Sequence, residues 1–409
     1  MKYNPGLLKL ELFCQGIKID GSCDLENDTR PVLRTRGGLG SGLDLILPPD
    51  LYVNVPLEER FVKKTPFLLF KNRYGYFIKK NGQRITEVIL PPKPRFYDKK
   101  TSSGKLMSRI GIMQGTYLAL YITQVCRFWQ MQPRANCRFC SVGLNVGKNE
   151  ELEKSIGDVL EVVKAAKKEE KITFVHFNTG FLFGKELDIL IPYIKAVKEK
   201  TGLLIGVQST PTDNLSKYDL LKKIGVDHLS FCLELFDEKK FKQICPGKSK
   251  YIGRKKYFEA INYCVKLFGK GKVAAEIIAG LEPPQNTVRA IEHFGKIGAV
   301  PTVCVFRPCL GTDLEKTPPP KPKEMLPVFR KLYQTCINNS IPVNMAPNIK
   351  VDLVILPEEA KYLLKNHDVK FFLLEAKMAI VRFLFRFYFR FRLFWFDNRS
   401  FLPFNRKID

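Results

Sequence analysis

Three cysteines, Cys126, Cys137 and Cys140, lie within the stretch CRFWQMQPRANCRFC at residues 126–140. Ten residues separate the first two cysteines and two separate the last two. Thiolates at C-x-x-C spacing can bind one metal centre, and a third thiol from the same loop completes a three-point face. A structural zinc site normally has four protein ligands, whereas three thiols on a [4Fe–4S] cluster leave one iron open. The spacing therefore indicates an iron–sulfur site that does chemistry.

The elements around this cysteine trio predict a parallel sheet. Apolar runs that read as strands span residues 117–123, 172–178, 203–209, 228–234, 273–281 and 302–308. Helical patterns lie between and after them, near residues 152–169, 185–200, 215–224, 254–268, 287–297 and 322–339. Apolar strands covered by amphipathic helices predict an α/β fold, here a partial (βα)6 TIM-like barrel. Chemistry in such barrels sits at the C-terminal ends of the strands, where the trio begins.

The N-terminal region is predicted to be β-rich. The runs LLKLELF, LDLILP, LYVNVP and GYFIKK read as short strands broken by Gly and Pro. The glycine-rich stretch RGGLGSGLD is interpreted as a turn, because a strand and not a helix follows it. Residues 91–105 are predicted to form an exposed linker. We expect an N-terminal β-rich domain at 1–112, a barrel domain at 113–348 and a C-terminal extension at 349–409.

The net charge and the cysteines indicate a cellular compartment, but they do not identify a binding partner. The formal net charge is +26, but the lysines are spread over helical faces, so we interpret them as solvated surface. The N-terminus has no sustained apolar run typical of a signal peptide, which predicts a cytoplasmic protein. In a reducing compartment, clustered thiols are read as metal ligands before disulfides.

The tail at residues 370–400 is dense in Phe and Arg. Arg382, Arg386, Arg390 and Arg392 interrupt it, so it is not predicted to span a bilayer. Arg382, Arg386 and Arg390 share one helical face, which suits an amphipathic helix at a membrane surface. A packed terminal helix or strand and a frameshifted reading frame are the alternatives, and no function is assigned to the tail.

From LALYITQVC to CVFRPCLGTDL, the chain resembles the radical S-adenosylmethionine (SAM) superfamily. The usual cysteine spacing in that superfamily is three residues and then two, whereas this chain has ten and then two. The Cys-x-aromatic-Cys ending is retained as CRFC, and the resemblance places Phe139 against the adenine of SAM. CRFCSVG, CPGKSKYIGR and AGLEP also resemble a branch without an assigned substrate, whose genes often lie beside a nitrilase gene.

The resemblance implies polar SAM contacts at the ends of successive strands. The turn formed by Asn178, Thr179 and Gly180 stands where the family binds the methionine amino group, although it lacks the family's usual acidic residue. Glu234, at the end of the fourth strand, matches a ribose or amino-group contact. The plain alternative is that Glu234 caps a helix.

Further positions carry the resemblance beyond the fourth strand. Ile278 and Gly280 match an adenine-contacting Ile-x-Gly, and Glu282 arrives one residue earlier than the family pattern. Arg254 opens a predicted helix and would hold the methionine carboxylate through a bidentate pair. The alternatives are that Ile278 is core and that Arg254 pairs with Glu259 on its own helix.

The resemblance implies two cofactors, a [4Fe–4S] cluster on the trio and SAM on its open iron. One electron passes to the sulfonium, and the carbon–sulfur bond breaks. Methionine and a 5′-deoxyadenosyl radical result, and the radical abstracts hydrogen from an unidentified small-molecule substrate. An external donor of the flavodoxin or ferredoxin type is expected, since no second cysteine cluster is evident.

Two other functions are compatible with the sequence. The positive charge also suits a radical SAM enzyme that modifies RNA, which salt-dependent RNA binding would reveal. A non-catalytic zinc protein would combine the trio with His176, Cys232 or Cys245, and metal analysis would separate zinc from iron and sulfide.

Overall fold

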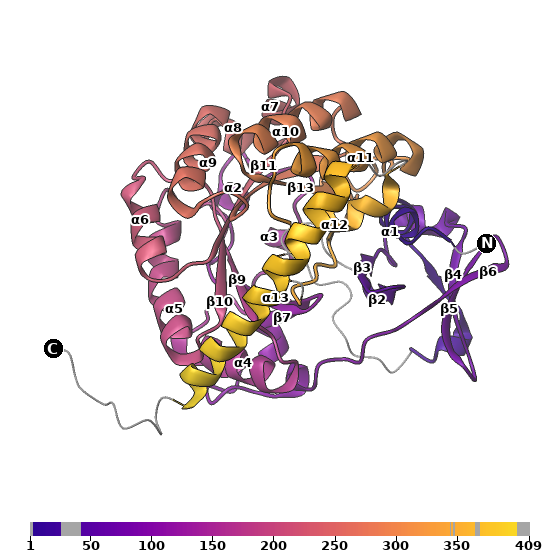
Figure 1. Cartoon of the computed structure of the whole chain (residues 1–409), viewed down its shortest axis with the longest axis horizontal. Helices are drawn as coiled ribbons and strands as arrows, with labels where there is room; N and C mark the ends of the chain where they lie inside the picture. The colour runs from indigo at the N-terminus through magenta and orange to yellow at the C-terminus, as the bar shows by residue number, and fades with distance from the viewer. Residues whose placement is uncertain (1–2, 26–41, 344, 347, 365–368, 399–409) are drawn as a thin grey trace.

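The computed structural model describes residues 3–25, 42–343, 345–346, 348–364 and 369–398, and an eight-stranded sheet forms its centre (Figure 1). The six parallel strands are β8 (Tyr117–Tyr121), β9 (Phe174–Asn178), β10 (Leu204–Gln208), β11 (His228–Glu234), β12 (Val273–Ala279) and β13 (Val300–Val305). Antiparallel strands form both edges, β7 (Gly111–Gln114) beside β8 and β14 (Val354–Ile355) beside β13. The predicted α/β fold, a partial barrel of six βα units, is confirmed.

Long helices follow the strands. They are α4 (Ile156–Glu169), α5 (Glu186–Thr201), α6 (Ser216–Lys223), α9 (Arg254–Phe268), α10 (Pro284–Ile297) and α11 (Pro322–Asn338). In α4 the buried Val159, Val162, Val163 and Ala166 recur at helical spacing, so one stripe packs on the sheet. Shorter helices lie in the loops beyond the C-terminal strand ends: α2 (Arg127–Gln130), α3 (Val142–Asn145), α7 (Glu238–Ile244) and α8 (Pro246–Tyr251).

The parallel register brings polar residues level at the C-terminal edge of the sheet. Tyr121 of β8 lies opposite Asn178 of β9, and Asn178 lies opposite Gln208 of β10. Gln208 in turn lies opposite Ser230 of β11. The loops that leave this edge can therefore meet over a shared row of side chains.

The N-terminal region contains the predicted strands and one helix that the sequence interpretation missed. Its four-stranded sheet has β1 (Lys18–Ile19), β4 (Phe67–Asn72), β5 (Gly75–Lys80) and β6 (Gln83–Val88), and β2 (Leu43–Leu47) pairs with β3 (Leu51–Val55). The run LLKLELF, predicted to be a strand, belongs instead to helix α1 (Pro5–Gln15). Asn4 caps the helix by accepting from Leu7 N, and Pro5 occupies its first turn. These start signals outweigh the alternating pattern.

Short turns complete the described elements. Single 3₁₀ turns span Gly21–Cys23, Arg60–Lys64, Arg95–Asp98, Met107–Arg109 and Lys361–Leu363, and α12 spans Pro357–Ala360. Residues 37–41 of the glycine-rich stretch lie outside the described residues. The division into domains at 1–112, 113–348 and 349–409 stays a prediction.

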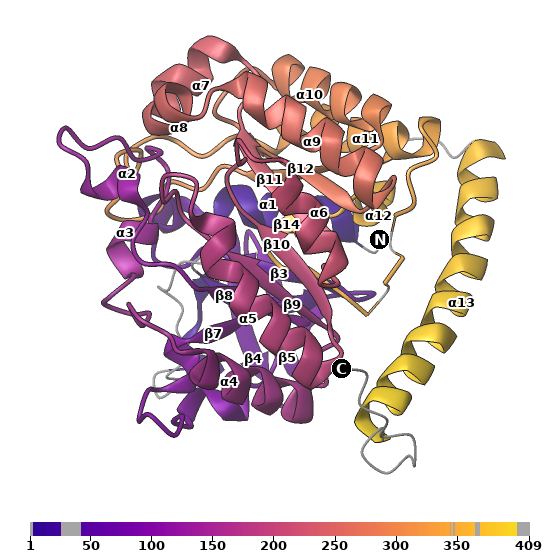
Figure 2. The same ribbon diagram turned by 90° about the vertical axis from the view of Figure 1, so that its left-hand side faces the viewer.

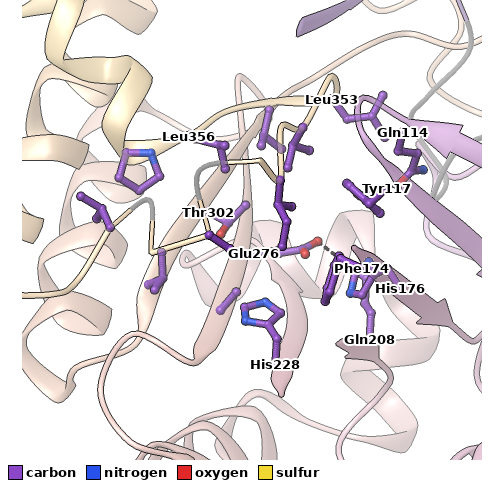
Figure 3. Close-up of a pocket in the computed structure, with 18 of the residues that line it drawn as sticks. Gln114, Tyr117, Phe174, His176, Gln208, His228, Glu276, Thr302, Leu353 and Leu356 are labelled. Atoms are coloured by element: carbon purple, nitrogen blue, oxygen red, sulfur yellow. Dashed lines mark hydrogen bonds between the residues drawn. The ribbon is translucent and has the colours of Figure 1, made fainter. Parts of the chain in front are cut away.

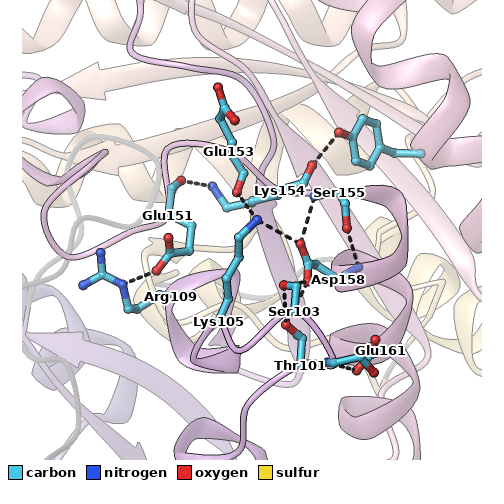
Figure 4. A network of polar contacts seen from close by, with 12 residues as sticks. Thr101, Ser103, Lys105, Arg109, Glu151, Glu153, Lys154, Ser155, Asp158 and Glu161 are labelled. Carbon is cyan, nitrogen blue, oxygen red and sulfur yellow. Dashed lines mark hydrogen bonds and ion pairs between the residues drawn. The ribbon is translucent and has the colours of Figure 1, made fainter.

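Residues 91–105, predicted to form an exposed linker, are exposed only in part, because some of them pack against helix α4 (Figure 4). Phe96 and Tyr97 are buried. Asp158 of α4 accepts a hydrogen bond of 2.8 Å from Thr101 Oγ1, and Lys105 Nζ lies 3.0 Å from its other oxygen. Burial opposes ionisation, but these hydrogen bonds and those from Ser103 and Ser155 lower the pKa of Asp158 below its usual range.

We expect Asp158→Asn to lower the free energy of unfolding by about 2–3 kcal/mol at pH 7, since hydrogen bonds to a buried charge are lost. A carboxyl with a lowered folded-state pKa stabilises the protein above its ordinary pKa of about 4 and loses that effect as pH falls through the folded value. The difference between wild type and variant should therefore shrink between pH 4 and pH 2. Urea unfolding at pH 7 and pH 3 measures it. Asp213→Asn, at an exposed ion pair with Lys256, is the control; an equal loss in both variants would contradict the argument.

The Phe/Arg-rich tail forms one helix of 30 residues, α13 (Val369–Asn398). In Figure 2 it stands on the side of the sheet away from α2 and α3. Leu374, Met378 and Phe389 are its buried side chains. Among the described helices, none combines the length and apolar character needed to cross a membrane.

Candidate active site

The cysteine trio converges on one pocket at the C-terminal ends of β8 to β11. Eight of the eleven sequence-predicted site residues line this cluster pocket: Cys126, Cys137, Phe139, Cys140, Asn178, Thr179, Gly180 and Glu234. They come from the loop after β8, the turn after β9 and the end of β11. Segments more than one hundred residues apart in the sequence thus meet at one site. Their roles toward a cofactor stay predictions.

The ten residues between Cys126 and Cys137 form an ordered excursion that returns to the pocket. Helix α2 begins directly after Cys126, and Arg127 N donates to Phe181 O at 2.9 Å. The Phe128 ring stacks on Phe181 with 4.3 Å between centroids. On the return, Arg138 N donates to the Ile244 carbonyl of α7 at 2.9 Å. Backbone hydrogen bonds and one aromatic stack therefore fix the expanded spacing.

Gly180 allows the turn after β9 to approach Cys126 closely. Phe181 N donates to Cys126 Sγ at 3.4 Å. A Cβ atom at position 180 would lie 2.6 Å from Cys126 Cβ and 2.5 Å from the hydroxyl oxygen of Tyr121. Any side chain here would therefore displace the first cysteine.

Burial controls the protonation of the three thiols. It raises the pKa of Cys126 to about 11 and raises that of Cys140 above its usual range. At Cys137, a hydrogen bond with Cys245 lowers the pKa despite burial. Thiolates are the ligands of iron–sulfur clusters, and a bound cation favours their deprotonation. Among the described residues, no three His, Cys, Asp or Glu side chains form a ready-made site for a single metal ion.

Two unpaired oxygens in the cluster pocket suit a polar ligand. Asn178 is 6% exposed, and within the described structure its Oδ1 has no hydrogen-bond partner. Thr179 Oγ1 is likewise buried without a partner there. Buried polar atoms are normally hydrogen-bonded. Three thiols, the buried Phe139 ring and these two acceptors thus match what a cluster and SAM require of a protein.

Lys248 of α8 is a pocket residue that the sequence analysis missed. Its ammonium lies 2.6 Å from Glu234 Oε1 and donates to the Cys232 carbonyl at 2.7 Å. Lys248 is 8% exposed and Glu234 9%. Burial alone would lower the pKa of Lys248, but attraction to Glu234 raises it well above its usual value. Lys248 differs from the neighbouring Lys250 only in being buried, so the sequence gives no sign that Lys248 is a pocket residue.

Glu234 stands at an irregular point of the sheet. Its φ angle is 73°, and the register between β11 and β12 shifts between Cys232 and Glu234. Side chains of a regular strand alternate between its faces, and this bulge re-aims one of them. The carboxylate lines the cluster pocket and is paired there with Lys248.

The structure does not bring the other three predicted residues to the pocket lining. The Arg254 guanidinium donates to the Phe236 carbonyl, and it lies 3.6 Å from Glu238 rather than beside Glu259. Ile278 is a fully buried residue of β12. At Gly280, φ is 103° and a Cβ would lie 2.7 Å from Pro320, so this glycine serves a tight approach.

Glu282 has a structural role. It accepts from Asp237 N at 2.8 Å and from Phe236 N at 3.1 Å. These are backbone N–H groups at the entrance to α7, which Asp237 caps. Glu282 therefore fixes the loop that leads to α8 and Lys248.

A second, larger cavity of about 510 Å³ lies among the strands (Figure 3). Asn178 and Gln208 line both this lumen cavity and the cluster pocket. Apolar and aromatic side chains such as Tyr117, Phe174 and Leu353 form much of its wall. A ligand in the lumen would therefore lie next to the cluster pocket.

Glu276 is the centre of the polar groups in the lumen cavity. Its Oε2 accepts from Gln208 Nε2 at 2.6 Å and from the Cys232 thiol at 3.0 Å, and its Oε1 accepts from Ser230. Burial raises the pKa of this carboxyl. The carboxylate accepts these hydrogen bonds, and burial makes its protonated form easier to reach than it would be in water.

Two histidines in the lumen cavity are held neutral. Burial lowers the pKa of His176 to about 3 and that of His228 to about 4. His176 is 9% exposed, and its Nε2 has no hydrogen-bond partner among the described residues. His176 lines the lumen cavity and not the pocket around the trio.

The lumen cavity extends to the N-terminal ends of the strands. Phe174 and Leu204 begin β9 and β10, and Asp227 and Lys272 directly precede β11 and β12. Phe385 of α13 also borders the cavity. The cluster pocket lies at the other ends of the same strands.

Comparisons with known proteins match part of the chain. Residues 133–295 match the sequence model of the radical SAM superfamily. The bacteriochlorophyllide c C-7(1)-hydroxylase of Chlorobaculum limnaeum is 33% identical over 111 residues, which make up 27% of this chain and 28% of that protein.

Solved structures resemble the chain at low sequence identity. HydG, a maturase of the [FeFe]-hydrogenase, has 17% identity and a TM-score of 0.41, covering 54% of this chain and 48% of its own. Coproporphyrinogen III oxidase from Escherichia coli has 15% identity and a TM-score of 0.38, covering 55% and 52%.

Proposed function

We propose that this chain is an enzyme of the radical SAM superfamily. In this proposal it cleaves SAM reductively at a [4Fe–4S] cluster held by Cys126, Cys137 and Cys140. The observation that carries the proposal is the convergence of this trio and Phe139 on one buried pocket. When bound, the cluster and SAM supply a radical that abstracts hydrogen. The matched part of the hydroxylase is under a third of its length, so its reaction is not transferred to this chain.

The chain's own residues bind and orient SAM in this proposal. Phe139 covers one face of the adenine. Ile278, the residue predicted for the other face, is buried in β12 and does not line the cluster pocket, so we assign it no contact. Asn178 and Thr179 accept hydrogen bonds from the amino group or ribose, which would satisfy their unpaired oxygens.

We assign the methionine carboxylate to Lys248. The sequence resemblance predicts Arg254 for this contact, but the Arg254 guanidinium is engaged by Phe236 and Glu238. Lys248 supplies a buried positive charge in the pocket itself. Glu234, its partner, can turn to the amino group or the ribose hydroxyls when the carboxylate arrives.

The substrate in this proposal is a small molecule in the lumen cavity. About 510 Å³ suits a compact, mainly apolar molecule. Polar groups on it would meet Glu276, Gln208 and the unpaired Nε2 of His176. A cavity of this size among the strands favours a small molecule over RNA. We also propose that an external donor of the flavodoxin or ferredoxin type supplies the electrons. The chain is proposed to belong to the branch whose genes lie beside nitrilase genes.

Anaerobic reconstitution with iron and sulfide tests the proposal. With dithionite and SAM, the brown protein should release 5′-deoxyadenosine and methionine in equal amounts. Zinc without sulfide, or a cluster that binds no SAM, would overturn it. Binding to a mixed RNA pool with a steep salt dependence would favour RNA as the substrate.

We expect Gly180→Ala to lower the iron content of the reconstituted protein several-fold. A methyl group here would meet Cys126 and Tyr121 at distances no relaxed side chain keeps. Iron and sulfide analysis measures the effect, and circular dichroism checks the fold. Gly157→Ala is the matched control, because its new methyl group would only touch Ser155 at 3.6 Å. Full iron content in Gly180→Ala would show that Cys126 tolerates displacement or is not a ligand.

A further inference from the structure

Helix α13 exposes a continuous apolar face to solvent. The exposed apolar residues at 373, 380, 384, 387, 391 and 394 recur at spacings of seven, four, three, four and three. This periodicity places them on one side of an α-helix. Phe387 is 73% exposed and Phe391 is 64% exposed, so much of this face is open to solvent in the described structure. Large exposed apolar patches mark interaction sites.

The opposite side of α13 is already packed against the protein. The exposed face is therefore not the face by which the helix joins the hydrophobic core. Met378 is 1% exposed and Phe389 is 5% exposed. Near the C-terminal end, a Cβ atom at Gly202 would lie 2.7 Å from the Phe396 ring. The helix therefore has two apolar sides, one docked on the barrel and one largely exposed.

Polar contacts also fix the orientation of the helix. Glu375 accepts from the Tyr333 hydroxyl at 2.6 Å, and Asp397 lies 2.7 Å from Lys167 Nζ. These are the only two acidic residues in the sequence of α13, and both are engaged by the body of the protein. No acidic side chain of the helix is left to repel an anionic surface.

Basic residues border the exposed face. Arg386 and Arg390 are exposed one turn apart along one edge, and Lys370 and Lys377 are exposed seven residues apart along the other. Long basic side chains can keep their charge in water while their stems lie along apolar groups. An apolar face of Phe and Trp with basic edges is the pattern of a helix lying in a membrane interface.

We propose that α13 docks this protein on the surface of an anionic lipid bilayer, with the helix lying in the plane of the interface. The exposed phenylalanines enter the region between headgroups and acyl chains. Arg386, Arg390, Lys370 and Lys377 contact the acidic headgroups, and the net charge of +26 adds attraction over a longer range.

Charge decides between a bilayer and a second copy of this chain. Pairing two α13 helices through the exposed face would bring two rows of Arg and Lys together, on chains that each carry a net charge of +26. The exposed carboxylate of the helix, Asp397, is already paired with Lys167 and does not offset them. An anionic lipid surface supplies the missing negative charge, and this complementarity favours it.

The test uses the full chain and vesicles of phosphatidylcholine with 30% phosphatidylglycerol, where about a third of the lipid carries a charge. Co-sedimentation should show binding that falls at least tenfold in pure phosphatidylcholine vesicles. The variant Phe383→Ser/Phe387→Ser/Phe391→Ser should bind at least tenfold more weakly, as should Arg386→Glu/Arg390→Glu. All five side chains are exposed, so the fold should survive, which circular dichroism checks.

A matched control removes exposed apolar side chains elsewhere. Tyr74→Ser/Ile89→Ser/Leu152→Ser should bind the anionic vesicles like wild type. Equal loss in this control would show non-specific adhesion and overturn the proposal. So would wild-type binding by the α13 variants. A dimer in light scattering that needs the same phenylalanines, without vesicle binding, would assign the face to a second copy instead. Cluster loading and 5′-deoxyadenosine release are not needed for any of these readings.

Discussion

Replacing Cys137 or Cys140 with alanine is expected to abolish cluster binding. Both thiols face the cluster pocket from the two ends of the CRFC turn, where Cys140 N donates to the Cys137 carbonyl at 3.0 Å. In the proposed site, removing either would leave two protein ligands for a cluster that takes three. Iron and sulfide after anaerobic reconstitution should fall to background, and the brown colour should be lost.

Cys264→Ala is the matched control, because this thiol is buried in α9 and does not line the cluster pocket. It should keep its cluster. Retained iron and sulfide in both Cys137→Ala and Cys140→Ala would overturn the ligand assignment. Cys126→Ala is the more informative variant, since its spacing departs from the family. A cluster that survives there would move the third ligand elsewhere, and Cys245, hydrogen-bonded to Cys137, is the neighbouring thiol to change next.

Replacing Lys248 with methionine is expected to weaken SAM binding by about tenfold to a hundredfold, because a hydrogen bond to a charged group contributes about 1.5–3 kcal/mol. Methionine keeps the length and apolar stem of lysine and removes only the charge. Calorimetric titration of SAM into reconstituted protein measures the affinity. Iron content should stay at the wild-type level, which separates this variant from the cysteine variants.

The ion pair with Glu234 calls for two controls. Removing one partner of a buried pair leaves an uncompensated charge and destabilises a protein by about 3–5 kcal/mol. The double variant Lys248→Met/Glu234→Gln relieves that cost, and it should regain stability without regaining SAM affinity. Arg254→Met tests the alternative cation and should bind SAM like wild type. A large loss in Arg254→Met with none in Lys248→Met would return the carboxylate contact to Arg254.

The barrel could be predicted from the sequence because its signals are local. Each parallel strand is an apolar run and each covering helix has a stripe at helical spacing, as in Val159, Val162 and Val163 of α4. The C-x-x-C turn and the Asn178–Thr179–Gly180 turn follow directly from those strands. Parallel register then brings the strand ends to the same edge, so residues far apart in the chain meet.

Other parts depend on packing that no local pattern reveals. Lys248 looks like any helical lysine until the bulge at Glu234 gives it a buried partner. Residues 91–105 have the composition of a loop, yet Asp158 gathers their hydroxyl groups. In α1, alternating leucines suggest a strand, and the capping Asn4 decides for a helix. The lumen cavity is a property of six strands together.

The opposite positions of the cluster pocket and the lumen cavity have a kinetic consequence. The loop at residues 126–140 lies beyond the C-terminal strand ends, and the lumen cavity extends to the other ends, where Phe385 lines it. A reductant that docks over the loop would not occlude the path of the substrate. Both can then be present in one ternary complex, and neither should act as a competitive inhibitor of the other. Steady-state rates measured against each at several fixed levels of the other should give intersecting rather than parallel reciprocal plots, with no inhibition at high donor concentration.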